Sequence, residues 1–192
     1  MTKSNSMLGA ALFAIAAAGL TTPALAASHR EAKSVMVGGA AMLPTKDIID
    51  NAVNSKDHTT LVAAIKAAGL VDTLKSAGPF TVFAPTNAAF AKLPAGTVDT
   101  LLMPANKPML TSVLTYHVVA GKMSAMKLAA AIKAGRGKAM LTTVQGGKLT
   151  ASMMGKTIML TDGKGGMAHV TIGNVNQSNG VIHVVDAVLL PK

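Results

Sequence analysis

The sequence contains no cysteine and no tryptophan, and tyrosine occurs only once. Without cysteine, the chain can form neither a disulfide nor a thiolate zinc site, and it offers no thiol for a lipid anchor. Its stability must therefore come from the burial of apolar surface. Because aromatic residues make up only 3% of the chain, we expect an aliphatic core in which some of the 13 methionines fill irregular gaps.

Acidic residues are also scarce, since 18 Lys and Arg face 8 Asp and Glu and give a net charge of +10. Residues 121–166 concentrate this imbalance, with a single acid, Asp162, among eight basic residues. Such a region attracts an acidic polysaccharide or an anionic membrane surface, and its lack of aromatic residues argues against nucleic acid as the ligand. A basic surface that is merely solvated remains an alternative. We expect the interaction residues to include Lys122, Lys127, Lys133, Arg136 and Lys138.

The first 26 residues have the features of a secretory signal peptide. Lys3 precedes an apolar run over residues 8–20, and Ala24-Leu25-Ala26 matches a signal peptidase site. The run is too short for the roughly 20 residues that span a bilayer. We therefore predict cleavage after Ala26 and a periplasmic or extracellular protein with a net charge of +9, because only one Lys and no acid is removed. An uncleaved membrane anchor is the alternative.

The remaining sequence predicts one α+β domain. Residues 27–43 show no sustained period, and we expect a flexible lead-in followed by a single domain over residues 44–192. Its first half contains amphipathic helical patterns over residues 44–54, 58–70, 71–77, 97–103, 109–119 and 126–134. From Ala139 the segments become short, rich in Thr and Val and separated by glycine, which indicates antiparallel strands with a two-residue turn at Gly146-Gly147.

The segment GPFTVFAPTNAAF, residues 78–90, combines a strand, a tight turn and the start of a helix. Pro85 should end the strand because it lacks the N–H that a ladder requires. Thr86 or Asn87 is then the natural N-cap of the helix. Some enzymes present a nucleophile or bind phosphate on such a turn, so the local pattern alone leaves a structural and a functional interpretation open.

No sequence motif indicates catalysis or a cofactor. The GKT at residues 155–157 lacks the glycine that a phosphate-binding loop needs and lies among predicted strands, and no G-x-S-x-G is present. None of the histidines has the spacing of a metal site: His29, His58, His117, His169 and His183. We interpret His117 and His183 as half-buried imidazoles bonded to the backbone, and we expect no metal and no cofactor.

Three segments, in order, carry a resemblance to a known family: FTVFAPTNAAF at 80–90, LTYHVVAGKM at 114–123 and NGVIHVVDAVLLP at 179–191. They resemble the signature segments of the fasciclin domain, and the similarity extends over about residues 44–192. The resemblance implies a wedge of β-strands packed with a helical layer, and adhesion or matrix interaction rather than catalysis. It also implies that residues 78–90 form a structural corner. Family members often carry Asp at the place of Asn87, and either residue can cap a helix.

Animal members of this family are associated with integrin binding through a Tyr-His segment and an Asp-Ile pair. Tyr116 and His117 match the first feature, but residues 173–178, GNVNQS, occupy the place of the second. The resemblance therefore marks Tyr116 and His117 as candidate interaction residues and makes an integrin partner doubtful.

Together, the sequence predicts a non-enzymatic binding protein of the cell surface or extracellular matrix, with an adhesion-type role. A periplasmic protein that binds a small molecule or lipid is the alternative, and a hydrolase is a third possibility. A roomy apolar pocket would favour the binding protein, and a close histidine, carboxylate and hydroxyl would favour the enzyme. A flat basic face without a pocket would favour adhesion.

Overall fold

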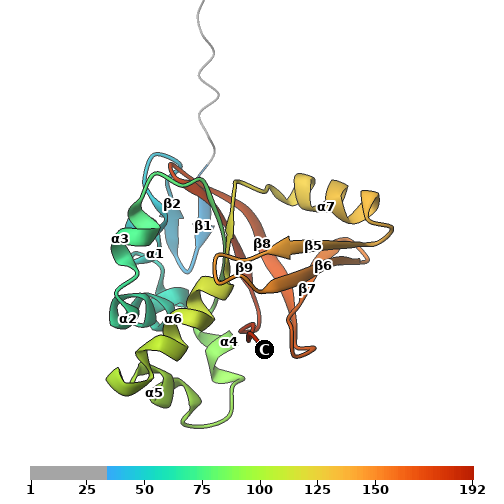
Figure 1. Ribbon diagram of the computed structural model, residues 1–192. Coiled ribbons are helices and arrows are strands. Elements are labelled where there is room, and N and C mark those ends of the chain that lie inside the picture. Colours follow the sequence, from blue (N-terminus) through green and yellow to red (C-terminus); the bar gives the residue numbers. More distant parts are fainter. Residues whose placement is uncertain (1–33) are drawn as a thin grey trace, which may run out of the picture. The chain divides into compact units, whose positions relative to one another are not determined.

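The computed structural model describes residues 34–192 (Figure 1). The predicted signal peptide and residues 27–33 lie outside the described residues. The first half of the described part is mainly helical, with α1 (Ile48–Ala52), η1 (Lys56–His58), α2 (Thr59–Ala68), α3 (Val71–Lys75), α4 (Asn87–Ala91), α5 (Thr97–Leu102), η2 (Pro104–Asn106) and α6 (Lys107–Tyr116). The predicted α+β class is confirmed.

The strands form a seven-stranded sheet in the order β4-β3-β9-β8-β7-β6-β5. Its members are β3 (Phe80–Pro85), β4 (Val118–Ala120), β5 (Lys138–Thr142), β6 (Lys148–Met154), β7 (Thr157–Thr161), β8 (Met167–Gln177) and β9 (Gly180–Val185). Neighbours are antiparallel except β3 and β9, which run parallel. A bridge between Val119 and Thr143 joins the two ends, so the sheet curls into a near-closed barrel.

Two apolar clusters lie on opposite sides of the central strands. The first packs α1, α2 and α6 against β3 and β9, and includes Ile65, Val82 and Ile182. The second lies beneath α7 (Ala125–Ala134), which packs along β5 and β6 (Figure 1), and includes Phe83 and Leu160. Strand β3 is thus covered on both faces, which explains why all of its residues except Thr81 are apolar.

The described part of the predicted lead-in is ordered and differs from that expectation. β1 (Val35–Val37) and β2 (Ala40–Met42) form an antiparallel hairpin, and both Val37 and Met42 are buried. The turn is Gly38-Gly39, with both residues at positive φ, which is the backbone that a two-residue hairpin turn requires. The domain therefore begins before Pro44.

The turn predicted at Gly146-Gly147 is longer than two residues. Strand β5 ends at Thr142 and β6 begins at Lys148, and the Thr143 N–H donates to the Gly147 carbonyl over 2.9 Å. Only Gly146 of the pair has a positive φ. The hairpin exists as predicted, but its two-residue turn does not.

The segment 78–90 builds a corner in which Thr86, not Asn87, caps α4. The Thr86 Oγ1 accepts from the Ala89 N–H over 3.2 Å. Asn87 instead connects α4 to the start of α2, because its Oδ1 accepts from the Thr60 N–H over 3.0 Å and its Nδ2 donates to the Lys56 carbonyl over 2.8 Å. A helix N-terminus that lacks its own side-chain cap thus receives one from a distant residue.

Asn179 forms a second connection between elements, which the sequence alone did not reveal. Its Oδ1 accepts from the Ile48 N–H at the start of α1, and its Nδ2 donates to the Leu74 carbonyl in α3. Its neighbour Gly180 faces the Phe80 carbonyl so closely that a Cβ would collide with that oxygen. The Asn-Gly of the third signature segment is therefore required for the close approach of β3 and β9.

Candidate functional site

The predicted basic residues all lie at the surface of the molecule. Lys122 precedes α7, Lys127 and Lys133 lie in its first and last turns, and Arg136 and Lys138 follow its C-terminus. The helix is about 15 Å long at 1.5 Å per residue. The structure therefore places Lys133, Arg136 and Lys138 at one end of α7, and Lys122 and Lys127 at the other.

The two lysines of α7 flank its buried stripe on opposite sides. At 100° per residue, Lys127 and Lys133 lie about 120° to either side of the direction of Leu128 and Ile132. Both can still reach the outer side of the helix, where Met126 is exposed. We define the basic rim as Lys122, Lys127, Lys133, Arg136 and Lys138.

No acidic residue neutralises the basic rim within residues 34–192. The ion pairs of this part involve Lys75, Lys92 and His169, with the carboxylates of Asp47, Asp50 and Asp186. The one acid of the basic region, Asp162, is buried and accepts from the backbone N–H groups of Lys164, Gly166 and Leu190. The positive charge of the rim is therefore presented to solvent.

Tyr116 is buried and packs at one end of the barrel. Its hydroxyl donates to the Lys148 carbonyl over 2.7 Å and accepts from the Gly163 N–H over 2.9 Å. Burial raises the pKa of the Tyr116 hydroxyl, so it stays protonated at neutral pH. The hydroxyl connects α6 to strand β6 and to the turn after β7.

His117 is also buried, and each of its ring nitrogens forms a hydrogen bond with a backbone group. Its Nε2 accepts from the Leu189 N–H over 3.0 Å, so Nδ1 carries the hydrogen and donates to the Val113 carbonyl over 2.7 Å. Burial lowers the pKa of His117 to about 4, although the Val113 carbonyl opposes the shift. Tyr116 and His117 are adjacent to each other but not part of the exposed basic rim.

His183 and His169 are two further histidines with nearby hydrogen-bonding groups. His183 is buried, contacts the Met123 carbonyl through Nε2 over 2.8 Å, and stacks on Phe83. His169 Nδ1 lies 3.3 Å from Asp186 Oδ2, and both side chains are about one-third exposed. Burial alone would raise the pKa of Asp186, but hydrogen bonds from His169 lower it below its usual value. No hydrogen bond from His169 to a hydroxyl is found within residues 34–192, so this pair lacks the nucleophile of a hydrolase site.

A polar cleft of about 580 Å³ lies beside the buried Tyr116. Lys148 and Thr150 of β6 line it, together with Asp162 and Lys192. The cleft is open to solvent and mixed in character, and it lies in the same basic half of the chain as the basic rim.

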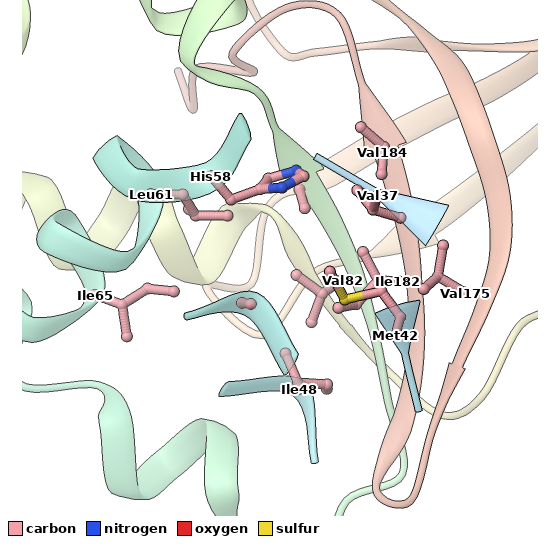
Figure 2. Close-up of a pocket in the computed structure, with 12 residues that line it drawn as sticks. Val37, Met42, Ile48, His58, Leu61, Ile65, Val82, Val175, Ile182 and Val184 are labelled. Atoms are coloured by element: carbon pink, nitrogen blue, oxygen red, sulfur yellow. The ribbon is translucent and has the colours of Figure 1, made fainter. Parts of the chain in front are cut away.

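An apolar cavity lies between the helical layer and the central strands (Figure 2). Its only ionisable lining residue is His58, a histidine that the sequence analysis did not single out. The remaining lining residues are Val37, Met42, Ile48, Ala52, Leu61, Ile65, Val82, Ala84, Val175, Ile182 and Val184. The sequence could not reveal this cavity, because its walls come from segments spread over almost 150 residues.

The described residues hold neither a metal-binding group nor a membrane span. Within residues 34–192, no three His, Asp or Glu side chains lie together in a way that could hold a metal ion. The helices of this same part are too short or too polar to cross a bilayer.

Comparison with family models identifies the class of protein. The model of the fasciclin domain matches residues 56–191. The chain therefore belongs to the fasciclin domain family, as the three signature segments predicted.

Several relatives are similar over most of the chain. Protein sll1483 of Synechocystis is 45% identical over 179 residues, covering 91% of this chain and 90% of its own length. The immunogenic protein MPB70 of Mycobacterium bovis is 38% identical over 196 residues, covering 92% and 93%. The cell surface glycolipoprotein MPB83 of the same species is 35% identical over 159 residues, covering 80% of this chain and 64% of its own length.

A solved structure shares the fold. The fasciclin I domain pair, from an insect cell adhesion molecule, superimposes with a TM-score of 0.68 at 18% identity. The match covers 77% of this chain and 52% of that one, so the chain spans about half of the pair. At this identity the comparison supports the fold only.

Proposed function

We propose that this chain is an exported, non-enzymatic binding protein of the cell surface or extracellular matrix, with an adhesion-type role. The observation that carries the proposal is the basic rim, whose five cations are exposed and have no ion-pair partner within residues 34–192. Family membership adds support, because a relative is named a cell surface glycolipoprotein and a protein of the same fold is named a cell adhesion molecule.

The partner class that fits the rim best is an acidic polysaccharide. Its repeated carboxylates can engage cations spread over both ends of α7, and no deep pocket is required for such contacts. The polar cleft beside Tyr116 offers Lys148 and Thr150 as further contacts for a sugar. An anionic membrane surface is the competing partner, and an integrin is not part of the proposal.

The test measures binding of the mature protein to a polyuronate, to anionic vesicles and to neutral vesicles. Binding to the polyuronate should weaken steeply from about 10 mM to about 150 mM salt, because the Debye length falls from about 30 Å to about 8 Å. Stronger binding to anionic vesicles than to the polyuronate would identify the membrane as the partner. Salt-insensitive binding would contradict a role for the rim.

A matched pair of variants separates the rim from net charge. The triple change Lys133→Glu, Arg136→Glu and Lys138→Glu should reduce binding at least tenfold with little change in stability, since exposed charges contribute little to folding. The control reverses three exposed lysines of the helical layer, Lys56, Lys66 and Lys107, and changes the net charge equally. Equal losses in both variants would mean that only the total charge matters.

Binding of a small molecule or lipid is the alternative that a roomy apolar pocket would favour. The apolar cavity around His58 has a volume of about 20 Å³, room for about one water, so it does not favour that alternative.

A further inference from the structure

The two faces of the β5–β6 hairpin differ sharply in burial. Ala139 and Leu141 of β5 point inward with Leu149 and Ala151 of β6, and all four lie buried in the second apolar cluster, on which α7 packs. Because side chains alternate along a strand, the residues between them point outward. The outward residues are exposed or half-buried: Lys138, Met140, Thr142, Lys148, Thr150 and Ser152.

The strand register arranges these outward residues in three rows across the hairpin. Each row joins one residue of β5 to one of β6 and includes a hydroxyl, and the two outer rows each include a lysine. At about 3.4 Å per residue, the first row lies about 14 Å from the last. We name this surface the β5–β6 track. Its rows are Lys138–Ser152, Met140–Thr150 and Thr142–Lys148.

The β5–β6 track connects the basic rim to the polar cleft. At one end, Lys138 is a member of the rim and follows Arg136 by two residues. At the other end, Lys148 and Thr150 also line the cleft beside Tyr116. An elongated ligand that lies along the track therefore meets cations at both of its ends.

The cleft has the size and the polarity of a site for a sugar ring. Its volume of about 580 Å³ lies within the range of about 300–1,000 Å³ that is common for small-molecule sites. The loop 145–147 after β5 and the turn at 162–163 after β7 contribute to its walls. Lys148 and Lys192 supply two ammonium groups to the lining.

The acid at the cleft does not neutralise Lys148. The Asp162 Oδ1 accepts from the backbone N–H groups of Lys164 and Gly166, and its Oδ2 accepts from the N–H of Leu190. No ion pair joins Lys148 to a carboxylate within residues 34–192. The Lys148 ammonium can therefore pair with a carboxylate of a ligand.

The chemistry of the track selects among anionic ligands. A hydroxyl in every row suits a partner that carries many hydroxyls, and a polyuronate carries both hydroxyls and a carboxylate on every unit. Met140 lies in the middle row with 65% of its surface exposed, and it offers an adaptable apolar contact to the C–H face of a sugar ring.

We propose that the cleft is a subsite for one uronate unit of an acidic polysaccharide, whose carboxylate pairs with Lys148, and that the adjoining units lie along the β5–β6 track toward Lys138. The inference rests on the proposed function and adds a division of roles to it. The rim supplies attraction that depends on salt, whereas the cleft selects a carboxylated sugar over other anions.

Nuclear magnetic resonance of the mature protein tests the subsite with galacturonate, its linear hexamer and neutral galactose. Galacturonate should shift the backbone amide signals of Gly147, Lys148 and Gly163 but not that of Arg136, with a dissociation constant in the millimolar range because the ligand has few atoms. The hexamer should bind more tightly and also shift the amides of Met140 and Arg136. Galactose at the same concentration should shift none of them.

Two matched pairs of variants separate the cleft from net charge and from bulk. Lys148→Ala should weaken galacturonate binding roughly tenfold, which is about the effect of one hydrogen bond to a charged group. Lys156→Ala, in the exposed β6–β7 turn, changes the charge equally and should have no effect. Thr150→Tyr should block the cleft, at a strand position that accepts an aromatic residue. Thr157→Tyr on β7, outside the cleft lining, is its control.

Several results would overturn the proposal. A hexamer that shifts the amide of Arg136 but none of the cleft amides would remove the subsite and leave the proposed function in place. Equal losses in Lys148→Ala and Lys156→Ala would mean that only total charge matters. Larger cleft shifts with an oligo-aspartate or with anionic vesicles than with the hexamer would assign the cleft to another ligand. A hexamer that does not bind at all would contradict both the subsite and the proposed function.

Discussion

Most of the polar residues in the signature segments act inside the molecule. Tyr116 and His117 each bond to backbone groups of distant strands or turns, and Asn179 joins α1 to α3. Sequence reasoning anticipated a backbone-bonded His117 from its place at a helix end. It could not identify the partners, because Leu189 is 72 residues away from His117.

The buried histidines predict loss of stability in acid. In the unfolded chain a histidine has a pKa of about 6.5, whereas His117 in the folded protein has a pKa of about 4. Between these values the unfolded chain binds more protons, so stability is full above about pH 6.5 and falls as the pH drops to 4. The loss from His117 is on the order of 3 kcal/mol, and the lowered pKa values of His58 and His183 act in the same direction.

Urea unfolding at pH 7 and pH 4.5 measures this effect. His117→Gln should be less stable than the parent at pH 7, and its free energy of unfolding should depend less on pH. An unchanged pH slope in this variant would show that His117 titrates normally in the folded protein.

The corner at residues 86 and 87 gives a second prediction. Thr86→Ala removes the cap of α4 and should cost about 1 kcal/mol. Asn87→Ala removes two hydrogen bonds, one to α2 and one to η1, and should cost at least as much. Asn87→Asp keeps Oδ1 for the Thr60 N–H but loses the bond to the Lys56 carbonyl. Its cost should therefore be intermediate, and denaturant melts of the three variants rank them. Full retention of stability in Asn87→Ala would contradict the bridging role.

At the scale of elements, two glycine pairs account for the two turns that were predicted wrongly. The helices from α1 to α7 and the strands after Ala139 follow their sequence periods. The β1–β2 hairpin was not predicted, because its strands have only three residues each and show no sustained period on either side of Gly38-Gly39. Gly146-Gly147 was predicted to be a two-residue turn, but the loop is longer, because the Thr143 N–H and Oγ1 both donate to the Gly147 carbonyl.

The two glycines of the first turn give a matched test. Both have positive φ, where a side chain costs roughly 1–2 kcal/mol. A Cβ at Gly39 meets open space, but one at Gly38 would collide with the Ser55 Oγ and the Asp57 backbone. Gly38→Ala should therefore destabilise the protein more than Gly39→Ala in denaturant melts. Equal losses would mean that the turn does not pack on Ser55.

At the scale of the whole molecule, sequence reasoning gave the fold class and the family but not how the chain closes. The parallel pairing of β3 with β9 and the Val119–Thr143 bridge join segments far apart, and no local pattern encodes them. The basic rim was predicted by composition. The apolar cavity was not, because its lining residues come from segments far apart in the sequence.

Export is a prediction at this scale as well. If residues 1–26 are a signal peptide, protein recovered from the producing cell should begin at Ala27, which intact-mass spectrometry measures directly. Recovery of a cytoplasmic form that still begins with Met1 would contradict both the cleavage site and the proposed location.

The parallel pairing of β3 and β9 has a consequence for how the chain folds. Phe80 pairs with Gly180, 100 residues later, so the central strands cannot assemble until nearly all of the polypeptide is present. Such long-range pairing raises the contact order and slows folding. A ribosome-bound chain would therefore stay unfolded until its final strand emerges, which leaves time for an unfolded chain to be threaded through a membrane translocation channel.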